Sequence, residues 1–99
     1  MSFQPLPPGT QVEWSSQANG SWITKRGRII CFVPAKEDAI VLAERQGYDP
    51  YPLMGQPISA IDRYVVLVEK VGARKTSRKF YVPPANKVRP VEAWEGAVQ

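Results

Sequence analysis

The side chains of this chain that could do chemistry are its cations, because the groups that usually perform catalysis are scarce. The sequence contains no histidine and a single cysteine. This removes the usual zinc, haem and catalytic-triad arrangements, and a metal site built from oxygen ligands would need an Asp-rich loop, which is absent. The paired carboxylates are typical of a helix start and of tail charges: Glu37 with Asp38, and Glu92 with Glu95. We therefore expect no metal, no cofactor and no enzyme activity.

The cysteine, Cys31, lies in the apolar run of residues 29–33. A single cysteine excludes an internal disulfide, and an apolar neighbourhood favours a buried, inert thiol. A reactive thiol is the alternative, but it would need a partner such as histidine to lower its pKa. We expect Cys31 to be part of the core.

Positive charge is concentrated in residues 70–89. This stretch contains seven basic residues and no Asp or Glu, although the whole chain has a net charge of only +4. Cations that reach a common surface can hold the phosphates of a nucleic acid. Alternatively, Lys and Arg only protect an edge strand from pairing with another chain, and regular alternation would put neighbouring cations on opposite faces. The candidate phosphate contacts in this stretch are Lys70, Arg74, Lys75, Arg78 and Lys79.

A second basic cluster consists of Lys25, Arg26 and Arg28, and Trp22 precedes it. These cations could also hold phosphates, and the indole of Trp22 could stack on a base or on an arginine. Three tryptophans in a chain of this length would ordinarily fill the core or cover its ends. We expect packing rather than stacking for Trp22, and keep stacking as the alternative.

The third candidate is the proline-rich stretch of residues 48–57, which we expect to be a loop outside the sheet. Its large side chains are Tyr48, Tyr51, Leu53 and Met54. They could form an adaptable apolar patch for a protein partner, since Tyr and Met are favoured at interfaces. A loop of this kind more often folds back to cap one end of a domain, and that is the interpretation we favour.

The elements that must position these residues are mostly strands. Alternation of Val12 and Trp14 predicts a half-buried strand over 11–15, and the Asn-Gly pair at 19–20 predicts a hairpin turn into a second strand. Gly27 predicts a bulge or bend before the β-branched run that ends at residue 33. The spacing of apolar residues predicts a short helix over 35–46. The remaining predicted strands are 64–69, apolar on both faces and therefore central, then 78–82, which forms a hairpin with it, and a short edge strand over 88–91.

The order of these elements resembles the SH3-like barrels, a group that includes KOW and Tudor-like modules. The residues that carry the resemblance are those opening the first strand (9–12), those of the second strand (27–30), and the segment 81–91, which looks like the strand, one-turn helix and strand that close such barrels. The resemblance implies a mainly β, SH3-like barrel of about five antiparallel strands. It would occupy residues 9–91, with a helix and Pro-rich insertion at 35–60, an extended N-terminal arm at 1–8 and a C-terminal tail at 92–99.

Two functions follow as hypotheses. The first is a non-enzymatic nucleic-acid-binding module, for DNA or RNA, that contacts phosphates through a basic β-hairpin. The alternative is a protein-interaction adaptor or inhibitor, which docks on a larger protein with an acidic surface through the Tyr- and Pro-rich loop or a barrel edge; a homo-oligomer is also left open. No apolar run approaches the roughly 18 residues that a membrane span needs, and no signal peptide is recognisable, so we expect a cytoplasmic protein without membrane contact.

Overall fold

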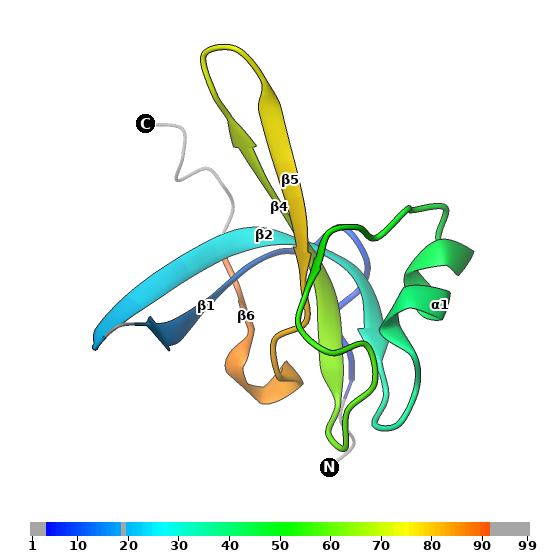
Figure 1. The fold of residues 1–99 in the computed structure, drawn as a ribbon. Helices are drawn as coiled ribbons and strands as arrows, with labels where there is room; N and C mark the ends of the chain where they lie inside the picture. The colour runs from blue at the N-terminus through cyan, green and yellow to red at the C-terminus, as the bar shows by residue number, and fades with distance from the viewer. Residues whose placement is uncertain (1–3, 19, 92–99) are drawn as a thin grey trace.

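A computed structural model describes residues 4–18 and 20–91 (Figure 1). Six strands form one mixed sheet in the order β3-β5-β4-β2-β1-β6. In chain order the elements are β1 (Gln11–Ala18), β2 (Ser21–Val33), α1 (Ala39–Arg45), β3 (Leu53–Met54), β4 (Arg63–Val71), β5 (Thr76–Tyr81), the 3₁₀ turn η1 (Ala85–Lys87) and β6 (Arg89–Pro90). The mainly β class and the single helix are therefore as predicted.

Strand β4 is central and buried on both faces. Tyr64, Val65, Val66 and Leu67 are each at most 1% exposed. Alternate residues of a strand point to opposite faces, so Val65 and Leu67 belong to one hydrophobic core and Tyr64 and Val66 to another. Helix α1 covers the first core through Ala39 and Ala43, and β1 closes the second through Val12 and Trp14. We call these the helix-side core and the β1-side core.

Strand β2 supplies side chains to both cores and contains a bulge that places two consecutive residues in the same core. Its pairing with β4 shifts between Ile29, opposite Val66, and Cys31, opposite Val65. Ile29 belongs to the β1-side core, whereas Ile30 and Cys31 both belong to the helix-side core. The extra residue therefore reverses which face the later residues of β2 present. The bulge thus lies three residues after Gly27, where the sequence predicted a bulge or a bend.

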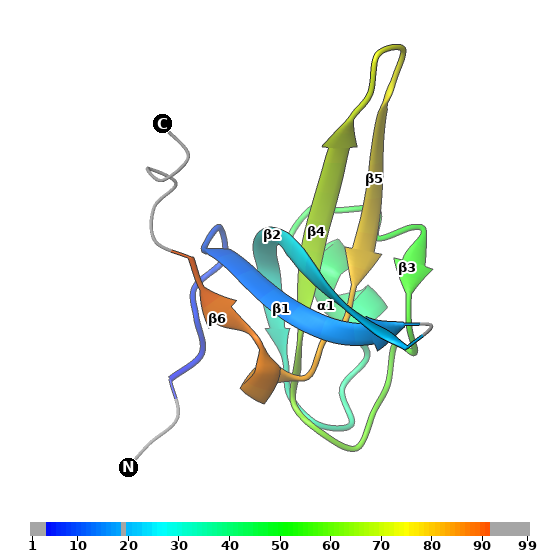
Figure 2. The ribbon, with the colours of Figure 1, turned by 90° about the vertical axis from the view of Figure 1, so that its left-hand side faces the viewer.

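Gly27 has another role, since it lies where β2 passes against β4. A Cβ atom at this position would overlap the backbone carbonyl oxygen of Leu67 and come within 2.9 Å of a methyl group of Val66. Only glycine permits this close approach of two backbones. The curved path of β2 is visible in Figures 1 and 2.

Helix α1 is shorter than predicted and begins at Ala39. The carboxylate of Asp38 caps its N-terminus and accepts hydrogen bonds from the backbone N–H of Ile40 (2.9 Å) and Val41 (3.5 Å). After the helix, Gly47 adopts a positive φ of 90°, which suits glycine at a helix stop. The residues before Asp38 form turns, so the predicted start at residue 35 was four residues too early.

Strands β4 and β5 form the predicted hairpin, which projects beyond the rest of the sheet (Figures 1 and 2). The pairing runs from Val66 opposite Tyr81 to Val71 opposite Thr76. The N–H of Gly72 donates to the carbonyl of Lys75 at 2.8 Å and closes the connection between the strands. Arg74 and Lys75 therefore occupy the tip, as the sequence indicated.

The sheet is not closed, which corrects the expectation of a five-stranded antiparallel barrel. Its two edges in the described part of the chain are β3 and β6, each two residues long. Strand β3 pairs parallel with β5, and β6 pairs with β1 only. Prolines limit both edges: Pro52 precedes β3, and Pro90 lies within β6, where it has no N–H to donate. The edge strand predicted over 88–91 is thus confirmed in part, as Arg89–Pro90.

Residues 4–8 of the N-terminal arm have no regular structure and cover the β1-side core. Leu6 packs against that core, and its backbone N–H donates to the hydroxyl of Tyr64 at 2.9 Å. The tail over 92–99 lies outside the described residues. Across the part of the chain that is described, no helix combines the length and the apolar character that a membrane crossing requires.

Candidate functional site

The two faces of β5 carry different chemistry. Arg78 and Phe80 lie on one face, while Lys79 and Tyr81 lie on the other, because consecutive residues of a strand alternate. Phe80 belongs to the helix-side core and Tyr81 packs on the β1-side core. The two neighbouring cations of the hairpin are therefore held on opposite sides of the sheet.

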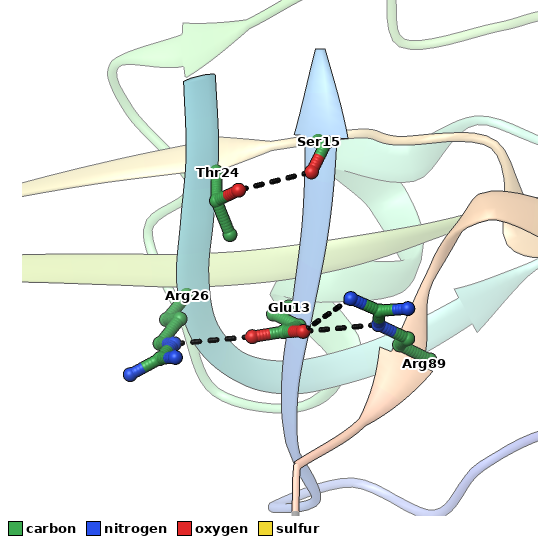
Figure 3. A network of polar contacts seen from close by, with 5 residues as sticks. All are labelled: Glu13, Ser15, Thr24, Arg26 and Arg89. Atoms are coloured by element: carbon green, nitrogen blue, oxygen red, sulfur yellow. Dashed lines mark hydrogen bonds and ion pairs between the residues drawn. The ribbon is translucent and has the colours of Figure 1, made fainter. Parts of the chain in front are cut away.

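Two carboxylates, Glu13 and Glu69, each form ion pairs with two arginines. Glu69 pairs with Arg28 (3.3 Å) and Arg78 (3.6 Å). Glu13 pairs with Arg26 (3.1 Å) and with Arg89 (2.7 Å), as Figure 3 shows. Three of the arginine and lysine residues predicted to hold phosphates, Arg26, Arg28 and Arg78, are thus already occupied by carboxylates.

Hydrogen bonds within these clusters also shift pKa values. Hydrogen bonds from Arg89 and then Arg26 hold the pKa of Glu13 below its ordinary value of 4.5. Hydrogen bonding with Tyr48, and next with Glu69, raises the pKa of Arg28. The central carbon of the Arg78 guanidinium also lies 6.0 Å from the centre of the Phe80 ring.

The lysines have a different environment. Within residues 4–18 and 20–91, no ion pair with a carboxylate involves Lys25, Lys70, Lys79 or Lys87, or Arg74 and Lys75 at the tip. Lys79 lies on the same face of β5 as Tyr81, and Lys70 lies on that face of β4, opposite Ser77. The ammonium of Lys25 lies 5.5 Å from the centre of the Tyr81 ring. We call Lys25, Lys70 and Lys79 the lysine face.

An open groove of about 430 Å³ adjoins this face, between the β1–β2 hairpin and the end of β5. Trp14 is 6% exposed, and its ring meets that of Tyr81 edge-on at 5.7 Å between centroids. Pro83 and Pro84 follow β5 along the groove, and Lys87 of η1 also contributes to its lining. We call this the aromatic groove; its lining also includes Trp22, Lys25 and Met54.

Sequence reasoning missed most of the groove. The segment after Lys79 was assigned to structure alone, yet it provides Tyr81, Pro83, Pro84 and Lys87. Alternation along β5 could have indicated that Tyr81 shares a face with Lys79, but the approach of β1 and β2 has no local signature. Lys87 was counted among the seven cations without being chosen as a site residue.

Trp22 contradicts the expectation that it packs into or against the core. This residue is 69% exposed, the highest value among the exposed large hydrophobic residues of the described chain. It is paired with Gln17 near the outer end of the β1–β2 hairpin, beyond the reach of either core. Its indole is therefore accessible at the rim of the aromatic groove.

The stretch of residues 48–57 divides between two roles. Tyr48 and Leu53 pack against the helix-side core, and Tyr48 meets Phe80 edge-on at 6.2 Å. Tyr51 and Met54 remain 54% and 42% exposed. The expectation that this stretch stays out of the sheet was wrong, because Leu53–Met54 pair with β5.

Cys31 is buried as expected, and burial raises the pKa of its thiol to about 11. Among the residues that the structure describes, no three His, Cys, Asp or Glu side chains are grouped so as to hold a metal ion. Comparison of the chain with protein-family models, with curated proteins and with solved structures gives no match.

Proposed function

We propose that this protein is a non-enzymatic nucleic-acid-binding module that contacts phosphates through its lysine face. The observation that carries the proposal is the separation of its cations by face. The arginines around Glu13 and Glu69 are paired, while Lys25, Lys70 and Lys79 have no carboxylate partner in the described chain.

The separation matters because a phosphate has to compete with whatever a cation already contacts. A guanidinium that donates to a carboxylate is locally neutral, and a phosphate would have to displace that carboxylate. An exposed ammonium without such a partner loses only water and counterions when it binds a phosphate. The basic hairpin thus remains the binding element, but its lysines rather than Arg78 make the contacts.

The fold proposal is a strongly bent, SH3-like sheet rather than a closed barrel. The succession of β5, the one-turn η1 and β6, which returns to pair with β1, supports it. This architecture does not by itself select a ligand. The charges and the aromatic groove therefore carry the functional argument.

A second candidate is an adaptor that docks on an acidic protein surface. The exposed Tyr51 and Met54 favour it, together with the unpaired outer edge of β5, since β3 covers only Phe80 and Tyr81. An extended segment could add to such an edge. Acidic surfaces of proteins would meet the same lysines.

The test is a comparison of two double variants that remove equal charge. Lys25→Gln with Lys79→Gln changes the lysine face, whereas Arg26→Gln with Arg78→Gln changes the adjacent residues on the other faces. Binding of a labelled short DNA, single-stranded and duplex, is measured by fluorescence anisotropy between about 50 and 200 mM salt. Wild-type affinity should fall with salt, and on duplex DNA each phosphate contact contributes a slope of about −0.9.

The lysine double variant should flatten the duplex slope by about 1.8, which corresponds to two lost phosphate contacts. The arginine double variant should keep a slope close to that of the wild type. Equal effects of the two double variants would refute the assignment to one face. Absence of salt-dependent binding in the wild type would refute the proposed function, and capture of a defined acidic protein by the wild type would then favour the adaptor.

A further inference from the structure

Trp22 is a large, exposed aromatic residue near the end of the β1–β2 hairpin. A tryptophan that is 69% exposed near the end of a two-stranded hairpin adds little to either core. Trp22 and Tyr81 line the same groove as Trp14, which is itself buried in the β1-side core. Aromatic groups gathered on an open surface are suited to stacking against a flat ligand.

Tyr81 lies beside a cation that could serve the same ligand. The Lys25 ammonium is 5.5 Å from the Tyr81 ring centre, and the two residues approach from different strands. A base packed in the groove would therefore have an ammonium close to its own phosphate. A nucleotide combines the two features that this pair is arranged to meet, a flat ring and an anion.

The lysine face continues from the groove along the hairpin. Lys79 is two residues from Tyr81 on the same face of β5, a separation of about 6.6 Å along a strand. Lys70 lies further out, opposite Ser77. A strand of nucleic acid leaving the groove would meet Lys79 and then Lys70. Neither lysine is paired with a carboxylate in the described chain.

We infer that the ligand of this surface is single-stranded nucleic acid, with a base stacked in the aromatic groove at Trp22 and Tyr81 and its backbone on Lys25, Lys79 and Lys70. This inference rests on the proposed function. In a duplex the faces of the bases are covered by neighbouring bases, so the aromatic side chains of the groove could not stack on them. In a single strand every base offers an exposed face, and stacking tolerates any sequence.

The test compares one short DNA sequence as a single strand and as a blunt duplex, with wild-type protein, Trp22→Ala and Tyr51→Ala. Tyr51 provides the matched control, because it is also an exposed aromatic residue, 54% exposed, but does not line the groove. Anisotropy measures affinity, and circular dichroism with a thermal melt checks that each variant remains folded. Because Trp22 is largely exposed, its replacement should leave the fold intact.

The wild type should bind the single strand more tightly than the duplex. Trp22→Ala should weaken single-strand binding by about fivefold or more, the loss of one stacked base, and leave duplex binding within about twofold. Tyr51→Ala should change neither. Equal affinity for both forms, with no effect of Trp22→Ala, would overturn this inference and leave the proposed function standing. Lack of binding to both forms would overturn both.

A fluorescence measurement checks the stacking contact directly. Titration with the single strand should quench tryptophan emission, because a stacked base is close to the indole of Trp22. Trp22→Phe should retain most of the affinity, since phenylalanine can still stack, and should lose most of the quenching. Unchanged quenching in Trp22→Phe would show that bases do not contact this position and would refute the stacking arrangement.

Discussion

Gly27 of β2 lies directly against the backbone carbonyl of Leu67 in β4, so closely that the position has no room for a Cβ atom. The contact occurs at the point where the β1–β2 hairpin leaves the central part of the sheet. It brings Lys25 and Trp14, which are paired across that hairpin, to the same side as Tyr81. The aromatic groove therefore depends on a glycine that is not part of it.

Gly27→Ala should destabilise the fold. The new methyl group would have to displace backbone, which is much less adaptable than a side chain, and overpacking of this kind costs about 1–3 kcal/mol. Urea denaturation measures the free energy of unfolding. Gly72→Ala is the comparison, since its Cβ would lie 3.1 Å from the carbonyl oxygen of Lys75 in an exposed turn, a contact that a shift of a few tenths of an ångström relieves, and the loss should be clearly smaller than at Gly27. Equal effects at both glycines would contradict the close approach.

Replacement of Asp38 by alanine should weaken the start of α1. The carboxylate accepts two backbone hydrogen bonds there, and loss of such a cap costs about 0.5–2 kcal/mol. Glu37→Ala, one residue earlier, removes a carboxylate for which the described structure records no capping bond, and its effect should stay within about 0.5 kcal/mol. Thermal and urea unfolding of the two variants should therefore differ; matching curves would argue against the cap.

Glu13 should make stability depend on pH on the acid side. Its pKa is lower in the folded chain than its ordinary value of 4.5, because Arg89 and Arg26 stabilise the charged form. The contribution is therefore complete above about pH 4.5 and is lost as the pH falls through the folded pKa. Glu13→Gln should be less stable than the wild type at pH 7, and the difference should shrink as the pH falls below 4.5. A difference that is constant between pH 7 and pH 3 would exclude this role.

Cys31 should react slowly with thiol reagents in the native protein. Burial raises its pKa from 9.0 to about 11, which lowers the thiolate fraction at pH 8 about a hundredfold, and only the thiolate attacks. Unfolding in urea should restore fast, stoichiometric labelling. Fast labelling of the native protein at pH 8 would contradict the burial of this thiol.

The sequence predicted the elements that have a local signature and missed relationships between distant segments. Alternation identified β1 by Val12 and Trp14, and the apolar run of 64–67 identified the central strand. The hairpin of β4 and β5 was also predicted. Each of these depends on spacing within a few residues, whereas the one-turn segment before β6 was implied by the resemblance to SH3-like barrels.

The ion pairs could not be predicted in this way. Glu13 and Arg89 are separated by 76 positions, and Arg28 and Glu69 by 41. Nothing in the local sequence distinguishes Arg78, which is paired, from Lys79, which has no carboxylate partner in the described chain. The same holds for Trp22, whose exposure follows from the length of the β1–β2 hairpin beyond the cores.

The bulge at Ile30 has a consequence for the way this protein can tolerate change in its sequence. Substitution of Ile30 by another apolar residue would alter a few contacts in the helix-side core. Deletion of Ile30 would remove the bulge itself and leave Ile29 opposite Val66 and Cys31 opposite Val65, so the residues on both sides of it would keep their faces. Relatives of this protein that share its groove should therefore tolerate loss of the bulge residue, whereas loss of one residue between Lys25 and Ile29 would turn Lys25 away from Tyr81.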